Sequence, residues 1–163
     1  MRKELARRLL IELLRDSKQS DRKLAKKLGV SQPTITRTRG KLEREGFIRS
    51  YTIIPDFRKL GFEIAAFTFV NMSPKIVSDE LLSKVKDYAS KYGNAFFAST
   101  GEGLGMTGMI ASIHKDYRDY SRKLALLRKD WGKYMEDIQS FIMVIDEGVI
   151  KDFSFECLDE NII

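Results

Sequence analysis

The sequence predicts an α+β protein in which a small domain with a winged helix-turn-helix precedes a ferredoxin-like βαββαβ domain. Charge is divided unevenly: residues 1–60 hold 17 Lys and Arg against 7 Asp and Glu, a net charge of +10, and residues 61–163 carry a net charge of −4. Apolar residues follow helical spacing in the first part and alternate with period two in the second. A glycine and a serine also separate two short helical patterns at the spacing of a tight turn.

The basic half begins with two helical segments. Residues 1–19 repeat leucine on one face at helical spacing. Ser20 is a suitable N-cap for a second, shorter segment, and Gly29 ends it because glycine accepts the left-handed conformation of a helix C-terminus. The small Ala25 lets the next helix approach closely, and Val30 fills the corner after the glycine. This spacing predicts a helix-turn-helix.

A third helical segment follows the turn and is the expected recognition helix. Ser31 is its N-cap, and Pro33 falls in its first turn, where a missing N–H costs little. Ile35 anchors it to the first two segments. Gly46 ends it before residues 47–55, whose alternating pattern predicts a strand that would form the wing.

We expect the recognition helix to lie in the major groove of DNA with its polar side chains outward. Amide, guanidinium and hydroxyl groups pair with base edges there, and nearby cationic groups meet phosphates. A helix-turn-helix can also bind protein, but the net charge of +10 favours DNA. The predicted base contacts are Ser31, Gln32, Thr34, Thr36 and Arg37, and the predicted phosphate contacts are Lys23, Lys26, Lys27, Lys41 and Arg49.

The acidic half has the order β-α-β-β-α-β of a ferredoxin-like domain. A connection bracketed by Pro55 and Gly61 places the boundary near residue 58, which gives domains 1–58 and 59–163. The strand patterns cover residues 62–72, 94–100, 105–114 and 137–146, and the helical patterns cover residues 79–93 and 115–135. The second helix carries one apolar stripe, typical of a core-facing surface: Tyr117, Tyr120, Leu124, Leu127, Trp131 and Tyr134.

The first and last strands of this sheet are apolar on both faces. Two helices cover only one face, and leaving the other open would expose a larger apolar patch than soluble monomers tolerate. We therefore expect a homodimer that packs sheet against sheet and can assemble further, with a C-terminal tail folded over the sheet as the alternative. A dimer also suits DNA because it reads two half-sites.

Residues 23–63, KLAKKLGVSQPTITRTRGKLEREGFIRSYTIIPDFRKLGFE, resemble the Lrp/AsnC regulators. The likeness covers the paired helices, the Leu-Glu-x-x-Gly-x-Ile exit at Leu42–Ile48, and Tyr51. Two residues depart from the family pattern: Arg39 stands at a commonly apolar position, and Gly40 follows it inside the helix. We expect Arg39 to carry its charge outward over its own stem. The resemblance implies a sequence-specific, DNA-binding transcriptional regulator.

The resemblance also implies that the ferredoxin-like domain dimerises, assembles further and senses an amino acid or another small effector. The family often has an acidic residue shortly after the glycine that follows the second strand. Here Thr100–Met109 reads TGEGLGMTGM, and Gly101, Glu102 and Gly103 are the candidate effector-binding residues. Backbone N–H groups of such a turn can receive a ligand carboxylate, although a flexible hairpin has the same glycines.

Composition argues against several other functions. With one cysteine, Cys157, and one histidine, His114, we expect neither a disulfide within the chain nor a metal or other cofactor. No apolar run is long enough to span a bilayer and no signal-peptide pattern occurs, which indicates a cytoplasmic protein without membrane contact.

Two rival functions are open: an architectural, chromatin-like DNA binder and an enzyme similar to the sirohaem decarboxylases, which resemble this two-domain layout. The enzyme would use His114 as its proton donor. We expect His114 instead to be a cap or a surface residue, and we expect the chain not to be an enzyme.

Overall fold

The computed structural model describes residues 2–73, 79–145, 147–155 and 157–158. The chain forms two compact units, one of residues 1–54 with residues from Lys151 onward, and one of residues 55–150. The division between Ile54 and Pro55 falls close to the boundary predicted near residue 58. The tail groups with the first unit, whereas the prediction placed it in the second domain.

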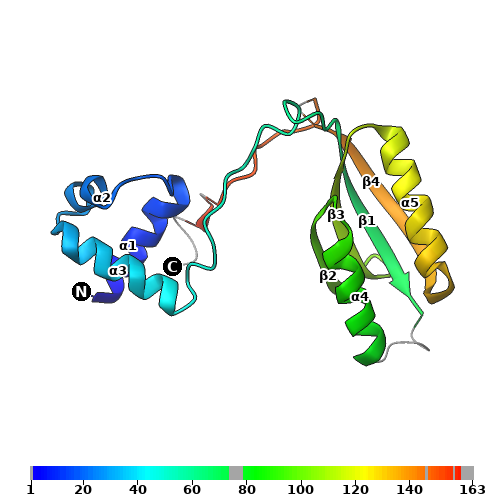
Figure 1. The fold of residues 1–163 in the computed structure, drawn as a ribbon, viewed down its shortest axis with the longest axis horizontal. Coiled ribbons are helices and arrows are strands. Elements are labelled where there is room, and N and C mark those ends of the chain that lie inside the picture. The colour runs from blue at the N-terminus through cyan, green and yellow to red at the C-terminus, as the bar shows by residue number, and fades with distance from the viewer. Residues whose placement is uncertain (1, 74–78, 146, 156, 159–163) are drawn as a thin grey trace. The chain divides into compact units, whose positions relative to one another are not determined.

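The core of the first unit is built by the helices α1 (Arg2–Arg15), α2 (Asp21–Leu28) and α3 (Gln32–Arg44) (Figure 1). Each helix gives one apolar face to a shared core, as the leucine spacing predicts. The most deeply buried side chains come one from each helix, so the core fixes all three together. The buried core residues are Leu9, Leu13, Leu24, Ala25, Leu28, Ile35 and Leu42.

The turn between α2 and α3 follows the local signals of the sequence. The Ser20 hydroxyl accepts a hydrogen bond from the backbone N–H of Lys23 at 3.3 Å, which caps α2. Gly29 has a φ of 70°, and its N–H donates to the carbonyl of Ala25, which ends the helix. A side chain at this φ would be strained, so glycine is required here.

The strand expected for the wing is not formed. Residues 48–56 have no regular secondary structure and pair with no strand in the described part of the chain. Ile53 is 83% exposed, so its side chain gains little from burial. Alternation alone does not make a strand, because an extended segment needs a neighbour to satisfy its N–H and C=O groups.

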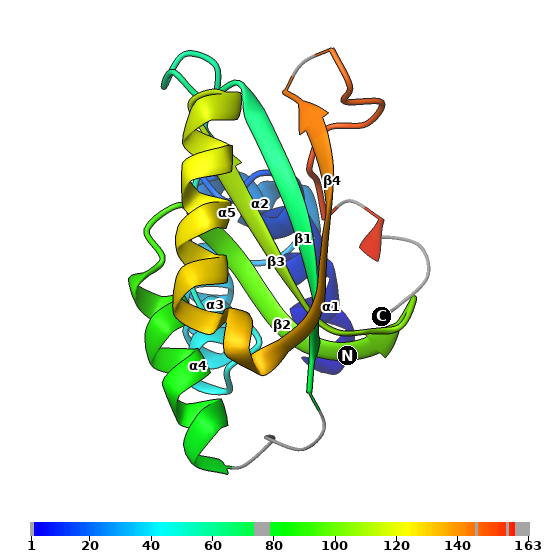
Figure 2. The same cartoon turned by 90° about the vertical axis from the view of Figure 1, so that its right-hand side faces the viewer.

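The second unit has the predicted β-α-β-β-α-β order (Figure 2). Its four-stranded sheet is antiparallel and has the order β2-β3-β1-β4. Both helices lie on one side of the sheet. The elements are β1 (Ile64–Met72), α4 (Asp79–Lys91), β2 (Ala95–Gly103), β3 (Met106–His114), α5 (Tyr117–Trp131), a 3₁₀ turn (Gly132–Tyr134) and β4 (Met135–Val144).

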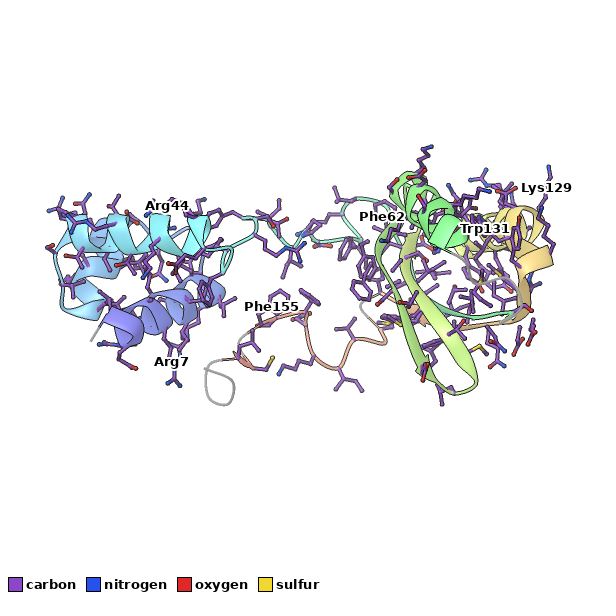
Figure 3. All side chains as sticks on the ribbon, turned by 90° about the horizontal axis from the view of Figure 1, so that it is seen from below. Arg7, Arg44, Phe62, Lys129, Trp131 and Phe155 are labelled. Carbon is purple, nitrogen blue, oxygen red and sulfur yellow. The ribbon has the colours of Figure 1, made fainter. Side chains whose placement is uncertain are left out.

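The apolar stripe of α5 forms the core between the helices and the sheet. Leu127 and Trp131 (labelled in Figure 3) are buried. The rings of Tyr88 and Tyr134 pack on Trp131 with centroids 5.4 and 5.6 Å away. Tyr117 is 64% exposed, so the stripe begins one turn later than predicted. Asp116 caps the helix by accepting the N–H of Asp119, which places Tyr117 in the first, exposed turn.

The sheet face opposite the helices is apolar, as predicted. On β1, the buried residues Ile64, Ala66, Thr68 and Val70 face the helices, so the alternate residues face the other way. The strand register places one residue from each strand in a row across this second face: Phe97, Ala111, Phe67 and Phe141. We call this row the aromatic row. Its outer members, Phe97 and Phe141, are 52% and 64% exposed.

His114 is buried, so the expectation that it caps a helix or lies at the surface is wrong. Only 2% of the residue is exposed, and its Nε2 lies 2.9 Å from the Ser112 hydroxyl. Its Nδ1 lies 3.0 Å from Asn94 Nδ2 and 3.6 Å from Asp119 Oδ2. Burial lowers the pKa of His114 and outweighs the Asp119 carboxylate, which raises it; the nearby Lys123 also lowers it. A ring so enclosed is a poor proton donor for a macrocyclic substrate.

This burial predicts acid sensitivity. The unfolded chain takes up a proton near pH 6.5 whereas the folded chain resists it, so the free energy of unfolding is greatest above that pH. It should fall as the pH drops from about 7.5 to about 5, by at most about 1.4 kcal/mol per pH unit. Urea unfolding at several pH values checks this.

His114→Gln is the control for that measurement. The chain has one histidine, and Asp119 has its pKa held below its ordinary 3.8 by Arg122, a backbone N–H and His114 despite the opposing burial. The variant should therefore show a nearly flat profile in this range. A wild-type profile as flat as that of the variant would show that the folded protein accepts the proton freely.

Candidate nucleic-acid interface

Some of the side chains predicted to contact bases already form hydrogen bonds within the protein, and others do not. Gln32 and Arg37 are exposed, and neither side chain has an ion pair or hydrogen bond with any residue that the structure describes. The hydroxyl groups of Ser31 and Thr34 lie 2.8 Å apart and bond to each other. The Thr36 hydroxyl donates to Asp21 Oδ2 at 2.6 Å.

The sequence predicts that Thr36 points outward, but its hydroxyl group is bonded within the protein. Its hydroxyl is held against the first residue of α2 and also bonds to the carbonyl of Gln32 at 3.2 Å. Of the side chains predicted to contact bases, Gln32 and Arg37 are thus exposed and have no hydrogen bond or ion pair with a described residue. An amide pairs with adenine and a guanidinium with guanine.

Among the predicted phosphate contacts, Lys27 is paired within the protein. Its ammonium group bonds to the carboxylate of Glu12, which also accepts from Arg15 Nη1 at 3.0 Å. Lys41 lies 3.6 Å from Glu45, and both side chains are about half exposed, so this pair is weak. Lys23, Lys26 and Arg49 are exposed and extend the cationic surface beside α3.

Glu12 is a residue that the sequence analysis missed. It is only 5% exposed, because its place three residues after Leu9 puts it beside the apolar face of α1. Burial raises the pKa of its carboxyl, but Lys27 and Arg15 outweigh this effect and hold the pKa below its usual value. A carboxylate on an apolar stripe was the signal that could have predicted a buried ion pair.

Arg39 also differs from the expectation. Its charge does not extend into solvent: the side chain is 18% exposed, and its Nε donates to Asp21 Oδ1 at 2.9 Å. Its Nη2 lies 2.8 Å from the same oxygen and donates to the carbonyl of Gln19 at 3.2 Å. Burial lowers the pKa of Arg39, but contacts with Tyr51 and Asp21 outweigh it, so the pKa is raised.

The candidate effector residues lie in the β2–β3 hairpin. Gly101, Glu102 and Gly103 form the end of β2 and are exposed, and the turn itself is Leu104–Gly105, with φ values of 54° and 71°. Two positive φ angles are typical of a tight hairpin turn. The structure thus places the three candidates beside the turn, on an edge strand.

The described residues offer neither a metal-binding cluster nor a membrane-spanning helix. Among the described residues, no three His, Cys, Asp or Glu side chains gather as a metal site. None of the described helices has both the length and the apolar character needed to cross a membrane.

Sequence comparison identifies the first unit and its relatives. Residues 2–49 match the family described as winged helix-turn-helix DNA-binding. An uncharacterized HTH-type transcriptional regulator of Pyrococcus furiosus is 33% identical over 118 residues, covering 68% of this chain and 80% of that protein. The HTH-type transcriptional regulator LrpA of Pyrococcus horikoshii is 27% identical over 113 residues, covering 69% and 78%.

Structural comparison confirms the fold. An AsnC family transcriptional regulator from Agrobacterium tumefaciens superposes with a TM-score of 0.79 at 24% identity, covering 95% of this chain and 96% of that one. Escherichia coli AsnC superposes with a TM-score of 0.72 at 16% identity, covering 92% and 96%. With the exposed polar face of α3 and the relatives named as regulators, these matches confirm both the predicted fold class and the predicted function. The chain is a DNA-binding transcriptional regulator and belongs to the Lrp/AsnC family.

Proposed function

We propose that the protein acts in the cytoplasm as a homodimer that places one α3 helix in each of two successive major grooves. DNA binding would reside in residues 1–58 and assembly in residues 59–163, with no enzymatic activity. Gln32 and Arg37 would read bases, aided by Ser31 and Thr34 at the start of α3. Lys23, Lys26, Lys41 and Arg49 would bind phosphates.

One observation carries this proposal. Within the same helix, Ile35 is fully buried while Gln32 and Arg37 are exposed and bond to no described side chain. The buried residue fixes the helix to its domain, and the free polar groups are available to a partner. A guanidinium on a rigid helix suits bidentate pairing with guanine.

The aromatic row supports dimer formation. Its outer phenylalanines are more than half exposed in the single chain, on a face that neither helix covers. A second copy offers a face of the same size and chemistry, so an isologous contact would remove the apolar surfaces of both copies from water. Further pairing of dimers would give higher oligomers.

A small effector is part of the proposal. Gly101, Glu102 and Gly103 border a tight hairpin with exposed backbone, which can offer N–H groups to a carboxylate. A transcriptional regulator of Neisseria meningitidis, NMB0573, forms a complex with L-Met and superposes with a TM-score of 0.78 at 15% identity, over 93% of each chain. An amino acid is therefore the first effector to test here.

Arg37→Ala should weaken binding to a preferred site by about 5- to 150-fold, because a bidentate base contact contributes about 1–3 kcal/mol. Binding to random DNA should fall much less. Lys26→Ala is the matched control: losing a phosphate contact should weaken both DNAs alike and reduce the salt slope by about one. Titrations of both DNAs at two salt concentrations measure these effects.

The same titrations decide between regulation and packaging. A wild-type preference ratio near one would favour an architectural binder, since cationic helices bind phosphates irrespective of sequence. Equal losses for Arg37→Ala on both DNAs would reassign Arg37 to the phosphate backbone.

A further inference from the structure

The contact between α2 and α3 contains a charged network at one point. Asp21, the first residue of α2, is about four-fifths buried and faces Arg39, which lies past the middle of α3. Two nitrogens of the Arg39 guanidinium contact Asp21 Oδ1: Nε at 2.9 Å and Nη2 at 2.8 Å. A third donor contact fixes the same guanidinium to the carbonyl of Gln19.

The second oxygen of Asp21 holds another residue of α3. Thr36 Oγ1 donates to Oδ2 at 2.6 Å, so one carboxylate binds two side chains that lie one turn apart on α3. Neighbours three residues apart share a helix face. Two bonds on one face fix both the position and the rotation of α3 against the end of α2.

That rotation sets the direction of the predicted reading residue. A helix turns about 100° per residue, so Arg37 lies about 160° around α3 from Arg39. Arg39, which the carboxylate holds, and Arg37 thus lie on nearly opposite sides of α3. We propose that the Asp21–Arg39 pair is a positioning device that aims Arg37 at the bases, and that Arg39 itself does not contact DNA.

Burial and charge separate this role from that of a phosphate contact. The Arg39 side chain is 18% exposed and its charge faces the Asp21 carboxylate, so the pair presents little net charge to DNA. Lys41, two residues later in the same helix, is 58% exposed and is suited to a phosphate. The inference rests on the proposed function in one respect, since it assumes that α3 reads bases.

The test uses the full-length protein with Arg39→Met, which keeps an unbranched stem but removes the charge and the fork. The ratio of affinities for the preferred site and random DNA should fall about 3- to 30-fold, with the affinity for random DNA and the salt slope unchanged. Lys41→Met is the control and should do the reverse: both affinities fall alike, the slope decreases by about one, and the ratio holds.

Three further variants guard against a simple loss of folding. Asp21→Asn keeps the shape and weakens the pair, so it should lower the ratio in the same direction while the urea midpoint stays near that of wild type. Arg39→Lys should rescue only part of the ratio, because a single ammonium cannot reproduce the fork. The double variant Asp21→Asn/Arg39→Met should lose no more than Arg39→Met alone.

Four outcomes would overturn the inference. A reduced salt slope for Arg39→Met would make Arg39 a phosphate contact. A lower urea midpoint with an unchanged ratio would make the pair purely structural. A wild-type ratio near one would remove the proposed function and the inference with it, whereas a high wild-type ratio that survives Arg39→Met removes the inference alone.

Discussion

Phe141→Asp should convert the protein to a monomer and weaken its binding to a two-half-site operator. Phe141 ends the aromatic row, and its 64% exposure in the single chain means that folding gains little from it. Dimer formation would bury an unpaired carboxylate from each copy, at a cost of about 3–5 kcal/mol per charge. Dimer affinity should therefore fall by at least about 100-fold. Sedimentation velocity measures the mass, and DNA titration measures the loss of the second half-site.

Tyr117→Asp is the matched control. Tyr117 has the same 64% exposure but lies in the first turn of α5, in the layer on the other side of the sheet. A carboxylate there is favourable to the helix N-terminus and lies away from the proposed contact. If Phe141→Asp sedimented as the wild type does, the aromatic row would not be the dimer surface.

Local signals in the sequence predicted the secondary structure well. The Ser20 cap and the left-handed Gly29 depend on bonds within a few residues, so the sequence specifies them directly. The open apolar face was also predictable, because strand alternation assigns each residue to a face once the helices are counted. Both inferences need only the neighbours in the chain.

Contacts across long stretches of chain were not predictable. Arg39 and Asp21 are 18 residues apart, and Lys27 and Glu12 are 15 apart, so their meeting depends on how the helices pack. A lysine or arginine on a helix gives the same pattern whether it faces solvent or a partner carboxylate. For this reason the sequence overestimated the freedom of Thr36 and Lys27.

The sequence failed to predict the burial of single polar residues for a related reason. His114 ends a strand, where a surface position is common, but α5 packs over it and brings Asp119 within 3.6 Å. The wing strand was predicted wrongly for the same reason, since strand pairing depends on a neighbouring strand that the local sequence does not specify. Elements that stand alone are predictable, and those that require a partner are less so.

Ile35→Ala should destabilise the DNA-binding unit more than any polar change proposed above. Ile35 is fully buried in the core that α3 shares with α1 and α2, a cluster that also contains Leu9 and Leu24. Removing three carbons leaves a cavity among rigid neighbours, with an expected loss of about 2–5 kcal/mol from the free energy of unfolding. This is a large part of the roughly 5–15 kcal/mol that stabilises a typical domain. DNA affinity should fall with it, because α3 loses its anchor.

Ile53→Ala makes the same chemical change at a residue that is 83% exposed in the same unit, and it should alter the unfolding free energy by less than about 0.5 kcal/mol. Urea unfolding of both variants, followed by helical circular dichroism, compares them directly. Similar midpoints would mean that α3 is held mainly by its charged network. In that case Arg39→Met, rather than Ile35→Ala, would release the helix, and the core would be secondary to the Asp21 anchor.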